Sequence, residues 1–408
     1  MANPLFAQLF GRHAGKETPF LKMQGGEVIS HADFLAMAAR FANVFQQLGL
    51  VAGDRLALPV ENSPQALAVY AAAVQSGIVF LPLNSGYTAK ELAYFVENSG
   101  ARLLICDPAR AEALAPIAKA VDARLETLDP EGSGSLADRA ATMPETFATA
   151  PREADDLAAF LYTSGTTGRS KGAMLTQTNL LSNAETLVDV WRFTDKDVVL
   201  HALPIFHTHG LFVATNVMLL TGGAMIFLPK FDLDAVIKQL HHATTMMGVP
   251  TFYTRLLEDR RFTRDLVDHM RLFVSGSAPL LAETHVQFEA RTGHRILERY
   301  GMTETNMNTS NPYDGARRAG TVGFPLPGVE LKITDPASGA SLRDGEIGQI
   351  EVRGPNVFKG YWQMPEKTRE ELREDGFFIT GDLGMIDDQG YLQIVGRNKD
   401  LIISGGYN

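Results

Sequence analysis

Short apolar runs alternate with helix-forming segments along most of the chain. The runs 55–59, 78–83 and 103–106 have the length and the bounding turn residues of buried strands. After the first run, Ser63 can cap a helix whose first turn contains Pro64. Strands that alternate with helices in this way predict a parallel sheet covered by helices.

A connection at 108–153 interrupts this alternation. It is rich in Ala, Pro, Gly and acidic residues, so we predict that it is irregular. Before it, Thr88 and Glu91 form a capping-box pattern that opens a helix, and Gly100 suits the end of that helix. After it the alternation resumes, with predicted strands at 157–161, 198–203, 224–228 and 272–275 and predicted helices at 233–242 and 251–258.

Short strands and tight turns dominate after Gly320. Strands are predicted at 330–333, 348–353 and 377–380, with a hairpin turn near 387–390. The fold class is therefore α/β, with two βα-layered subdomains and a smaller β-rich subdomain that we expect to be a distorted barrel. The expected boundaries are about 1–178, 179–320 and 321–395, within a body of residues 1–398.

Composition narrows the class of protein. The length of 408 residues exceeds one ordinary domain, and 45% hydrophobic with 21% charged residues is typical of globular proteins. The net charge of −10, with no block of like charges, argues against nucleic acid as a partner. No apolar stretch approaches the ~18 residues of a membrane span, so no membrane partner is expected. The choice between monomer and dimer stays open.

Cysteine use and the N-terminus predict a cytoplasmic location. The single cysteine, Cys106, excludes an intramolecular disulfide framework and a cysteine-cluster metal site. It stands in the apolar run 103–106, where a buried thiol is expected. The first residues lack a basic region followed by an apolar one, so no signal peptide is expected.

The densest candidate chemistry lies at 162–172, which reads Tyr-Thr-Ser-Gly-Thr-Thr-Gly-Arg-Ser-Lys-Gly. Its glycines let backbone N–H groups approach an anion, and four hydroxyls with Arg169 and Lys171 add donors and positive charge. A phosphate-gripping loop is the functional interpretation, and a solvated loop is the alternative. The spacing is not that of a Walker A loop, because Gly172 follows the lysine where a hydroxyl residue is needed.

The ordered string in this loop resembles the signature of the adenylate-forming enzymes: acyl-CoA synthetases, firefly-luciferase-like proteins and the adenylation domains of peptide synthetases. Residues 298–304, Glu-Arg-Tyr-Gly-Met-Thr-Glu, resemble a second signature of that family, although alone they also suit a strand that ends in a turn. Further matches follow in the family's order at 275–279, 345–348, 360–362, 380–382 and 396–397. The resemblance covers essentially the whole chain and implies the large N-terminal body of such an enzyme.

The resemblance also implies roles for single residues. Tyr300 stacks on adenine, Thr303 bonds the α-phosphate and Glu304 helps to hold Mg²⁺, which suits an aromatic face, a hydroxyl and a hard carboxylate. The implied catalytic residues are Lys171, His207, Thr303 and Glu304. The other implied nucleotide contacts are Thr163, Ser164, Gly165, Thr166, Thr167, Gly168, Lys171, Gly276, Ser277, Ala278, Pro279, Glu298, Gly301, Met302, Asp382 and Arg397.

The family's reaction explains why these groups are needed. A carboxylate attacks the α-phosphorus of ATP, pyrophosphate leaves, and an acyl-adenylate forms; in acyl-CoA synthetases the thiol of coenzyme A then displaces AMP. The protein's task is positioning and electrostatic stabilisation of the spreading phosphate charge. The implied cofactors and co-substrates are ATP, Mg²⁺ and coenzyme A.

The acid substrate is indicated by other residues. His207 matches a histidine beside the acyl pocket and coenzyme A tunnel of related ligases, and no Asp occurs at 200–230 to hold an amino acid's ammonium group. Arg255 and Arg299 fall in segments that line that pocket in relatives. Buried unpaired guanidinium groups require an anion, so a second carboxylate on the substrate is expected, with Met302 favouring a short acid. Surface or salt-bridged arginines are the alternative.

The chain is most similar in this region to the malonyl-CoA synthetase branch of the family, through residues 299–310 and 318–323. We therefore predict ligation of malonate or methylmalonate to coenzyme A, with release of AMP and pyrophosphate. The alternatives are an acyl-CoA synthetase for a short monocarboxylic acid and a nucleotide-binding body without turnover. Relatives continue beyond Lys399, the matching hinge position, into a lid that carries a catalytic lysine. Residues 399–408 hold only its start, so we expect this chain to bind ATP and malonate but to form adenylate slowly.

Overall fold

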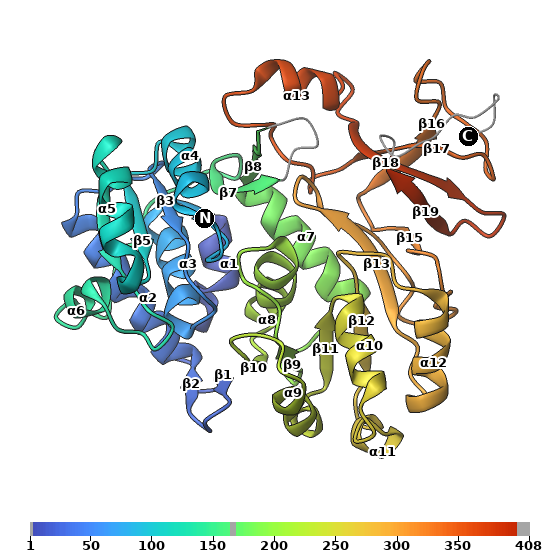
Figure 1. The fold of residues 1–408 in the computed structure, drawn as a ribbon, viewed down its shortest axis with the longest axis horizontal. Helices are drawn as coiled ribbons and strands as arrows, with labels where there is room; N and C mark the ends of the chain where they lie inside the picture. Colours follow the sequence, from blue (N-terminus) through green and yellow to red (C-terminus); the bar gives the residue numbers. More distant parts are fainter. Residues whose placement is uncertain (1–2, 164–168, 398–408) are drawn as a thin grey trace.

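The structure, a computed structural model, describes residues 3–163 and 169–397. The chain forms three sheets with their helices, and Figure 1 shows it running broadly from blue on the left to red at the upper right, with the blue strands β1 and β2 beside β10. The first sheet has six strands in the order β6-β5-β3-β4-β7-β8, parallel except for the β7–β8 pair. Its strands are β3 (Arg55–Leu58), β4 (Val79–Pro82), β5 (Leu103–Cys106), β6 (Arg124–Thr127), β7 (Leu157–Thr163) and β8 (Lys171–Thr176).

Helices cover both faces of this sheet. Leu56 and Leu58 of β3 join a core cluster with α2 and α3, whereas Ala57 joins a second cluster with α4 and α5. Successive strand residues point to opposite faces, which explains why the inner strands β4 and β5 are apolar at every position. The bounds are α1 (Pro4–Leu9), η1 (Gly11–His13), α2 (His31–Gln47), α3 (Pro64–Ser76), α4 (Ala89–Ser99), η2 (Pro108–Arg110), α5 (Ala111–Ala120) and α6 (Ser135–Ala140).

The second sheet has nine strands in the order β15-β14-β13-β12-β11-β9-β10-β1-β2. Its middle pairs are parallel, and antiparallel strands flank it at both edges. The strands are β1 (Pro19–Met23), β2 (Val28–Ser30), β9 (Val198–His201), β10 (Ala224–Phe227), β11 (Thr245–Gly248), β12 (Leu272–Ser275), β13 (Leu297–Met302), β14 (Asn306–Ser310) and β15 (Phe324–Pro325). Its helices are α7 (Gln177–Val190), the π-helix η3 (His209–Thr215), α8 (Asn216–Thr221), α9 (Leu233–Gln239), η4 (Leu240–His242), α10 (Pro250–Glu258), α11 (Arg264–Val267) and α12 (Ala282–Thr292).

The third sheet is smaller and antiparallel, in the order β16-β17-β18-β19. Its turn at Asp387 and Gly390 joins β18 to β19, as the sequence predicts. Figure 1 shows it above β13 and β15, with α13 beside the end of the first sheet. The bounds are β16 (Glu330–Thr334), β17 (Gly348–Arg353), α13 (Pro365–Glu371), β18 (Phe378–Ile386) and β19 (Leu392–Arg397).

The mixed α/β architecture of the sequence analysis is confirmed, but two local details differ. Residues 108–153 are not an irregular connection, because they contain η2, α5, β6 and α6. Leu114 and Ala118 bury one face of α5, a helical period that the many alanines obscure in the sequence. The N-terminal hairpin β1–β2 joins the second sheet through β10, so the two α/β subdomains are not successive stretches of chain.

Local signals for caps and burial agree with the structure. The side chains of Ser63 and Thr88 cap α3 and α4, and Gly100 ends α4 in the left-handed conformation. Cys106 is a buried free thiol, and burial raises its pKa to about 11. None of the helices in the described ranges is both long and apolar enough to cross a bilayer.

Candidate active site

The hairpin β7–β8 carries the predicted phosphate loop between its strands. Thr163 ends β7 and pairs with Lys171, the first residue of β8. At Gly172 a Cβ atom would lie 2.3 Å from the ring of Phe160, so only glycine fits there. The hydroxyl of Thr163 is buried without a partner in the described part of the chain. The predicted contacts Ser164, Gly165, Thr166, Thr167 and Gly168, like the hinge Lys399, lie outside the described residues.

Predicted nucleotide residues also follow the ends of β12 and β13. Gly276 to Pro279 come directly after β12, and Ser277 has a φ of +70°, unusual for a residue with a side chain. Tyr300, Gly301 and Met302 end β13, and Thr303 and Glu304 form its turn into β14. Ligands of open α/β sheets bind outside the carboxyl ends of parallel strands, so these residues stand where a ligand is expected.

Tyr300 joins the second sheet to the third. Its hydroxyl donates to Asp382 Oδ2 at 2.5 Å, and Arg397 Nε lies 2.8 Å from Asp382 Oδ1. Burial raises the pKa of Asp382. The structure thus brings together three residues from different parts of the sequence that the family resemblance implies as nucleotide contacts.

A second polar network connects the turn after β13 to the phosphate-loop hairpin. The Tyr361 hydroxyl lies between two carboxylates, 2.8 Å from Glu304 Oε1 and 2.6 Å from Glu371 Oε2, and its single proton can be donated to only one of them at a time. Lys171 Nζ lies 3.0 Å from the Tyr361 hydroxyl and 3.0 Å from Glu371 Oε2. Burial raises the pKa of Glu304. Neither Tyr361 nor Glu371 was a predicted site residue; the family motif at 360–362 pointed to the tyrosine, and no motif pointed to the glutamate.

These oxygen groups suit Mg²⁺. A small hard cation is commonly held by one or two carboxylates together with substrate phosphates and water, and Glu304 presents a carboxylate beside Lys171. No cluster of three or more His, Cys, Asp or Glu side chains that could form an all-protein cage occurs within the described ranges. A metal at Glu304 would therefore depend on the nucleotide for its other ligands.

A buried arginine stands on the other face of β13. Arg299 is 3% exposed, and its Nε and Nη2 have no hydrogen-bond partner among the described residues. Its guanidinium lies over Gly276, where a Cβ atom would come within 2.3 Å of Cζ. Burial lowers the pKa of Arg299 to about 9. An uncompensated buried cation is costly, so this position calls for an anion that the described protein residues do not supply.

The surroundings of Arg299 include a residue that the sequence analysis missed. His209, at the start of the π-helix η3, is buried, and its pKa is held well below the usual value by burial and by the charge of Arg299. Its Nδ1 lies 3.2 Å from Ser277 Oγ, and its Nε2 has no partner in the described ranges. Single-turn π-helices are frequent at functional sites. The signal available in the sequence was the second histidine of the His-Thr-His run.

The other predicted substrate residues lie in different surroundings. Arg255 is exposed on α10, with its guanidinium 4.9 Å from the centroid of the Phe231 ring, so the expectation of two buried arginines is wrong for this one. It follows Tyr253, which faces the core, and such near neighbours on a helix point in different directions. His207 is exposed beside Phe206. Their roles at the substrate stay predictions.

Glu298 already has a protein partner. Its Oε1 lies 3.3 Å from Nδ1 of the buried His285 on α12, and burial raises the pKa of this carboxyl group. The neighbouring Met302 is half-buried, with its sulfur 3.9 Å from the Tyr300 hydroxyl. A nucleotide contact of Glu298 would have to compete with His285.

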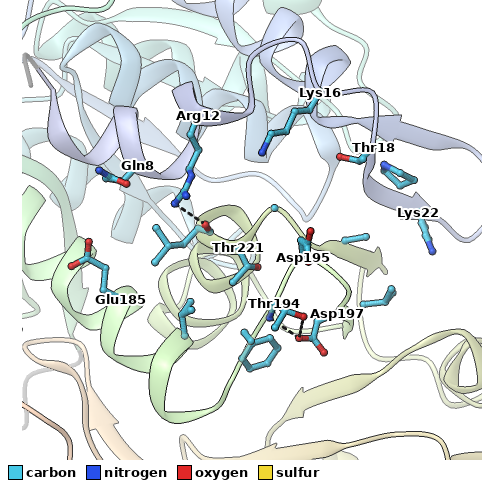
Figure 2. A pocket seen from close by; sticks show the side chains of 17 residues that line it. Gln8, Arg12, Lys16, Thr18, Lys22, Glu185, Thr194, Asp195, Asp197 and Thr221 are labelled. Carbon is cyan, nitrogen blue, oxygen red and sulfur yellow. Dashed lines mark hydrogen bonds between the residues drawn. The ribbon is translucent and has the colours of Figure 1, made fainter.

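A cleft of about 900 Å³ lies elsewhere, between the N-terminal segment and the elements around α7 and α8. Figure 2 shows Arg12 and Lys16 on one wall and Glu185 and Asp195 on the opposite wall. None of the predicted site residues lines it. Its two walls carry opposite charges, so the cleft has no clear preference for an anion or a cation.

Comparisons with known proteins identify the family of this chain. The AMP-binding enzyme family matches residues 10–362. The malonate–CoA ligase of Arabidopsis thaliana is 36% identical over 89% of this chain and 63% of its own length. A feruloyl-CoA synthase of Amycolatopsis is also 36% identical, over 94% of this chain and 76% of that protein. The crystal structure of ATP-bound MatB from Rhodopseudomonas palustris has a TM-score of 0.98 at 58% identity, over 100% of this chain and 81% of that one.

The chain spans less than two thirds of the Arabidopsis relative, so these similarities concern the body described above. Within that body, the family match covers both the phosphate-loop hairpin and the turn that carries Glu304. It also covers Tyr361, which connects the two. The chain belongs to the AMP-binding enzyme family.

Proposed function

We propose that the complete enzyme ligates malonate or methylmalonate to coenzyme A. ATP is consumed through an acyl-adenylate intermediate, and AMP and pyrophosphate are released. The ATP-bound relative MatB supports the nucleotide, and the Arabidopsis malonate–CoA ligase supports the acid. The feruloyl-CoA synthase shows that a similar identity also occurs with another acid, so the choice of acid rests on the site itself.

The observation that carries the proposal is the unpaired guanidinium of Arg299. A carboxylate that reaches Nε and Nη2 would form two charge-assisted hydrogen bonds in a dry environment. Malonate has one carboxylate for adenylation and a second one for such a contact. A monocarboxylic acid would leave the buried cation uncompensated, which is unfavourable.

The chain's other residues would act on the nucleotide. Thr303 and the ammonium of Lys171 are donors for phosphate oxygens, and Glu304 would hold Mg²⁺, which supplies charge neutralisation during in-line attack on the α-phosphorus. Tyr300 offers a ring for adenine, and Asp382 a carboxylate for the ribose hydroxyls. His209 is neutral and adds no second cation beside Arg299. Positioning and electrostatics are thus the protein's contribution.

The rival function is ligation of a short monocarboxylic acid, with Arg299 paired inside the wall of the pocket. That pairing is not found within the described ranges, where no carboxylate reaches the guanidinium. Arg255 is exposed, so the dicarboxylate proposal depends on Arg299 alone.

The test is a thermal unfolding series on this chain with Mg-ATP and one acid at a time. A ligand that binds only the folded state adds about 2.7 kcal/mol at about 100 times its Kd, a readable shift. We expect additional stabilisation from malonate or methylmalonate and none from acetate or hexanoate. Stabilisation by the monocarboxylates alone would contradict the choice of acid. No shift with Mg-ATP in any combination would contradict the nucleotide site.

A further inference from the structure

The ammonium group of Lys171 is fully occupied by protein groups. It can donate three hydrogen bonds, and it has three acceptors: the Tyr361 hydroxyl at 3.0 Å and the two carboxylate oxygens of Glu371 at 3.1 and 3.0 Å. The side chains of Lys171 and Glu371 are only 15% and 21% exposed, so water screens this pair weakly. To contact a phosphate, Lys171 must give up at least one of these acceptors.

Glu371 has a second cation at hand. Lys367, one turn earlier on α13, lies 2.9 Å from Glu371 Oε1. The Tyr361 hydroxyl lies 2.6 Å from the other oxygen and can donate its single proton either there or to Glu304. If Lys171 leaves, Glu371 therefore keeps its ion pair with Lys367, and no uncompensated charge remains in the partly buried network.

The backbone around Tyr361 is firmly held. Met174 N donates to Gly360 O at 3.0 Å, and Trp362 N donates to Gly172 O at 2.8 Å, so this segment runs along β8. Tyr361 N also donates to the Thr368 side chain of α13 at 2.9 Å. The two partners of Lys171 are thus fixed relative to the hairpin, and the flexible lysine side chain is the part that can move.

We propose that Glu371 is a positioning residue. Its carboxylate pairs with Lys171 as a phosphate would, until the nucleotide binds. The carboxylate keeps the lysine ordered beside the hairpin, and the phosphates of ATP then displace it, with Lys367 remaining on Glu371. This inference rests on the proposed function, since it needs a nucleotide whose phosphates reach Lys171. No bond is made or broken in the exchange; only ion-pair partners change.

In this exchange Glu371 competes with phosphate for Lys171. Removing the charge of Glu371 should therefore raise the affinity for Mg-ATP. In Glu371→Gln the amide still accepts a hydrogen bond but no longer pairs as an anion, so Lys171 is released more easily. We expect Mg-ATP to bind this variant several-fold more tightly, measured by isothermal titration calorimetry on the full chain. A residue with a merely structural role would weaken the site or leave it unchanged.

A neighbouring residue supplies the matched control. Glu370 carries the same charge on the same helix and pairs with Lys367 at 2.9 Å, without a contact to Lys171. Glu370→Gln should leave the Kd for Mg-ATP within about twofold. The affinity gain of Glu371→Gln should also vanish in a Lys171→Met background, because the two residues then no longer interact.

Lys367→Met tests the same inference independently. Without Lys367, Glu371 becomes unpaired when Lys171 leaves, so Mg-ATP should bind several-fold more weakly. Unchanged or weaker binding by Glu371→Gln, or an equal gain in the Lys171→Met background, would overturn the inference while the proposed function stands. If the unsubstituted chain does not bind Mg-ATP at all, the proposed function fails and the inference fails with it.

Discussion

Replacing Arg299 by methionine should stabilise the ligand-free protein and remove its affinity for the dicarboxylate. The pKa of this guanidinium is lowered from 12.5 to about 9 by burial. A change of this size corresponds to a cost of about 5 kcal/mol for the charged form. Because hydrophobic replacements of buried charges recover only about 1–4 kcal/mol, we expect the thermal unfolding midpoint to rise by about 1–5 °C.

The effect on malonate should have the opposite sign. Truncating one partner of a buried, hydrogen-bonded charge pair costs about 2–5 kcal/mol, or roughly 30-fold to several thousand-fold in affinity. The assay is the thermal shift caused by malonate in the presence of Mg-ATP, together with calorimetric binding of malonate. Binding of ATP alone should change much less, because within the described residues Arg299 forms no hydrogen bond or ion pair with Lys171, Glu304 or Tyr361 of the phosphate network, and its guanidinium touches the predicted nucleotide residues at Gly276.

Arg255→Met is the matched control. This arginine is exposed and rests on the Phe231 ring, so its loss should change the unfolding midpoint by less than about 1 °C. If Arg299→Met lowers the midpoint by several degrees and retains malonate binding, the guanidinium is a structural group and the reasoning from its unpaired nitrogens is wrong. A strong loss of malonate binding in the Arg255 variant alone would move the carboxylate site to α10.

Three further predictions follow from other buried groups. In Glu304→Gln the amide oxygen can still accept a hydrogen bond from Tyr361, so the variant should fold. Its affinity for Mg-ATP should fall by about tenfold or more, whereas its affinity for ATP without Mg²⁺ should fall less. Equal losses in the two titrations would show that Glu304 does not hold the metal. Burial lowers the pKa of His201 to about 4, so the unfolded chain takes up a proton as the pH falls below 6.5 and the folded protein does not. This histidine should therefore cost about 2 kcal/mol of stability between pH 7 and pH 5, and denaturant unfolding at the two pH values should show that His201→Asn lacks this share of the loss. In Gly301→Ala the new Cβ would stand 2.0 Å from the carbonyl oxygen of Asn306, so β13 and β14 must shift and the variant should lose about 2 kcal/mol or more; an unchanged unfolding midpoint would contradict this packing.

The local fold was predictable where the signal lies within a few consecutive residues. The strands 103–106, 272–275 and 348–353 have the predicted bounds, and the capping box at Thr88 opens α4 as expected. The helices and the strand within segment 108–153 were not predictable from the sequence, because an alanine-rich helix such as α5 shows little contrast between its buried and exposed faces.

The candidate site was predictable only in part. The resemblance singled out Tyr300, Asp382 and Arg397, and the structure joins them by hydrogen bonds and an ion pair. Glu371 was not predicted, because a glutamate in a charged segment such as 365–371 is indistinguishable in the sequence from a solvent-exposed one. Its role becomes visible only when α13 packs beside the hairpin. The burial predicted for Arg255 was wrong, because its position around the axis of α10 points the side chain outward. The match of this segment to relatives does not reveal that orientation.

By itself, the sequence determined the α/β class, most strand and helix positions, and the motifs that assign the chain to its family. These properties depend on periodicity, caps and short motifs, which act over a few residues. Only the tertiary structure decided the strand order, the return of the N-terminal hairpin to the second sheet, the lack of a partner for Arg299 within the described residues, and the occupation of Lys171 by Glu371. Burial and charge pairing arise between segments distant in the chain, so they come into existence only when the sheets are assembled.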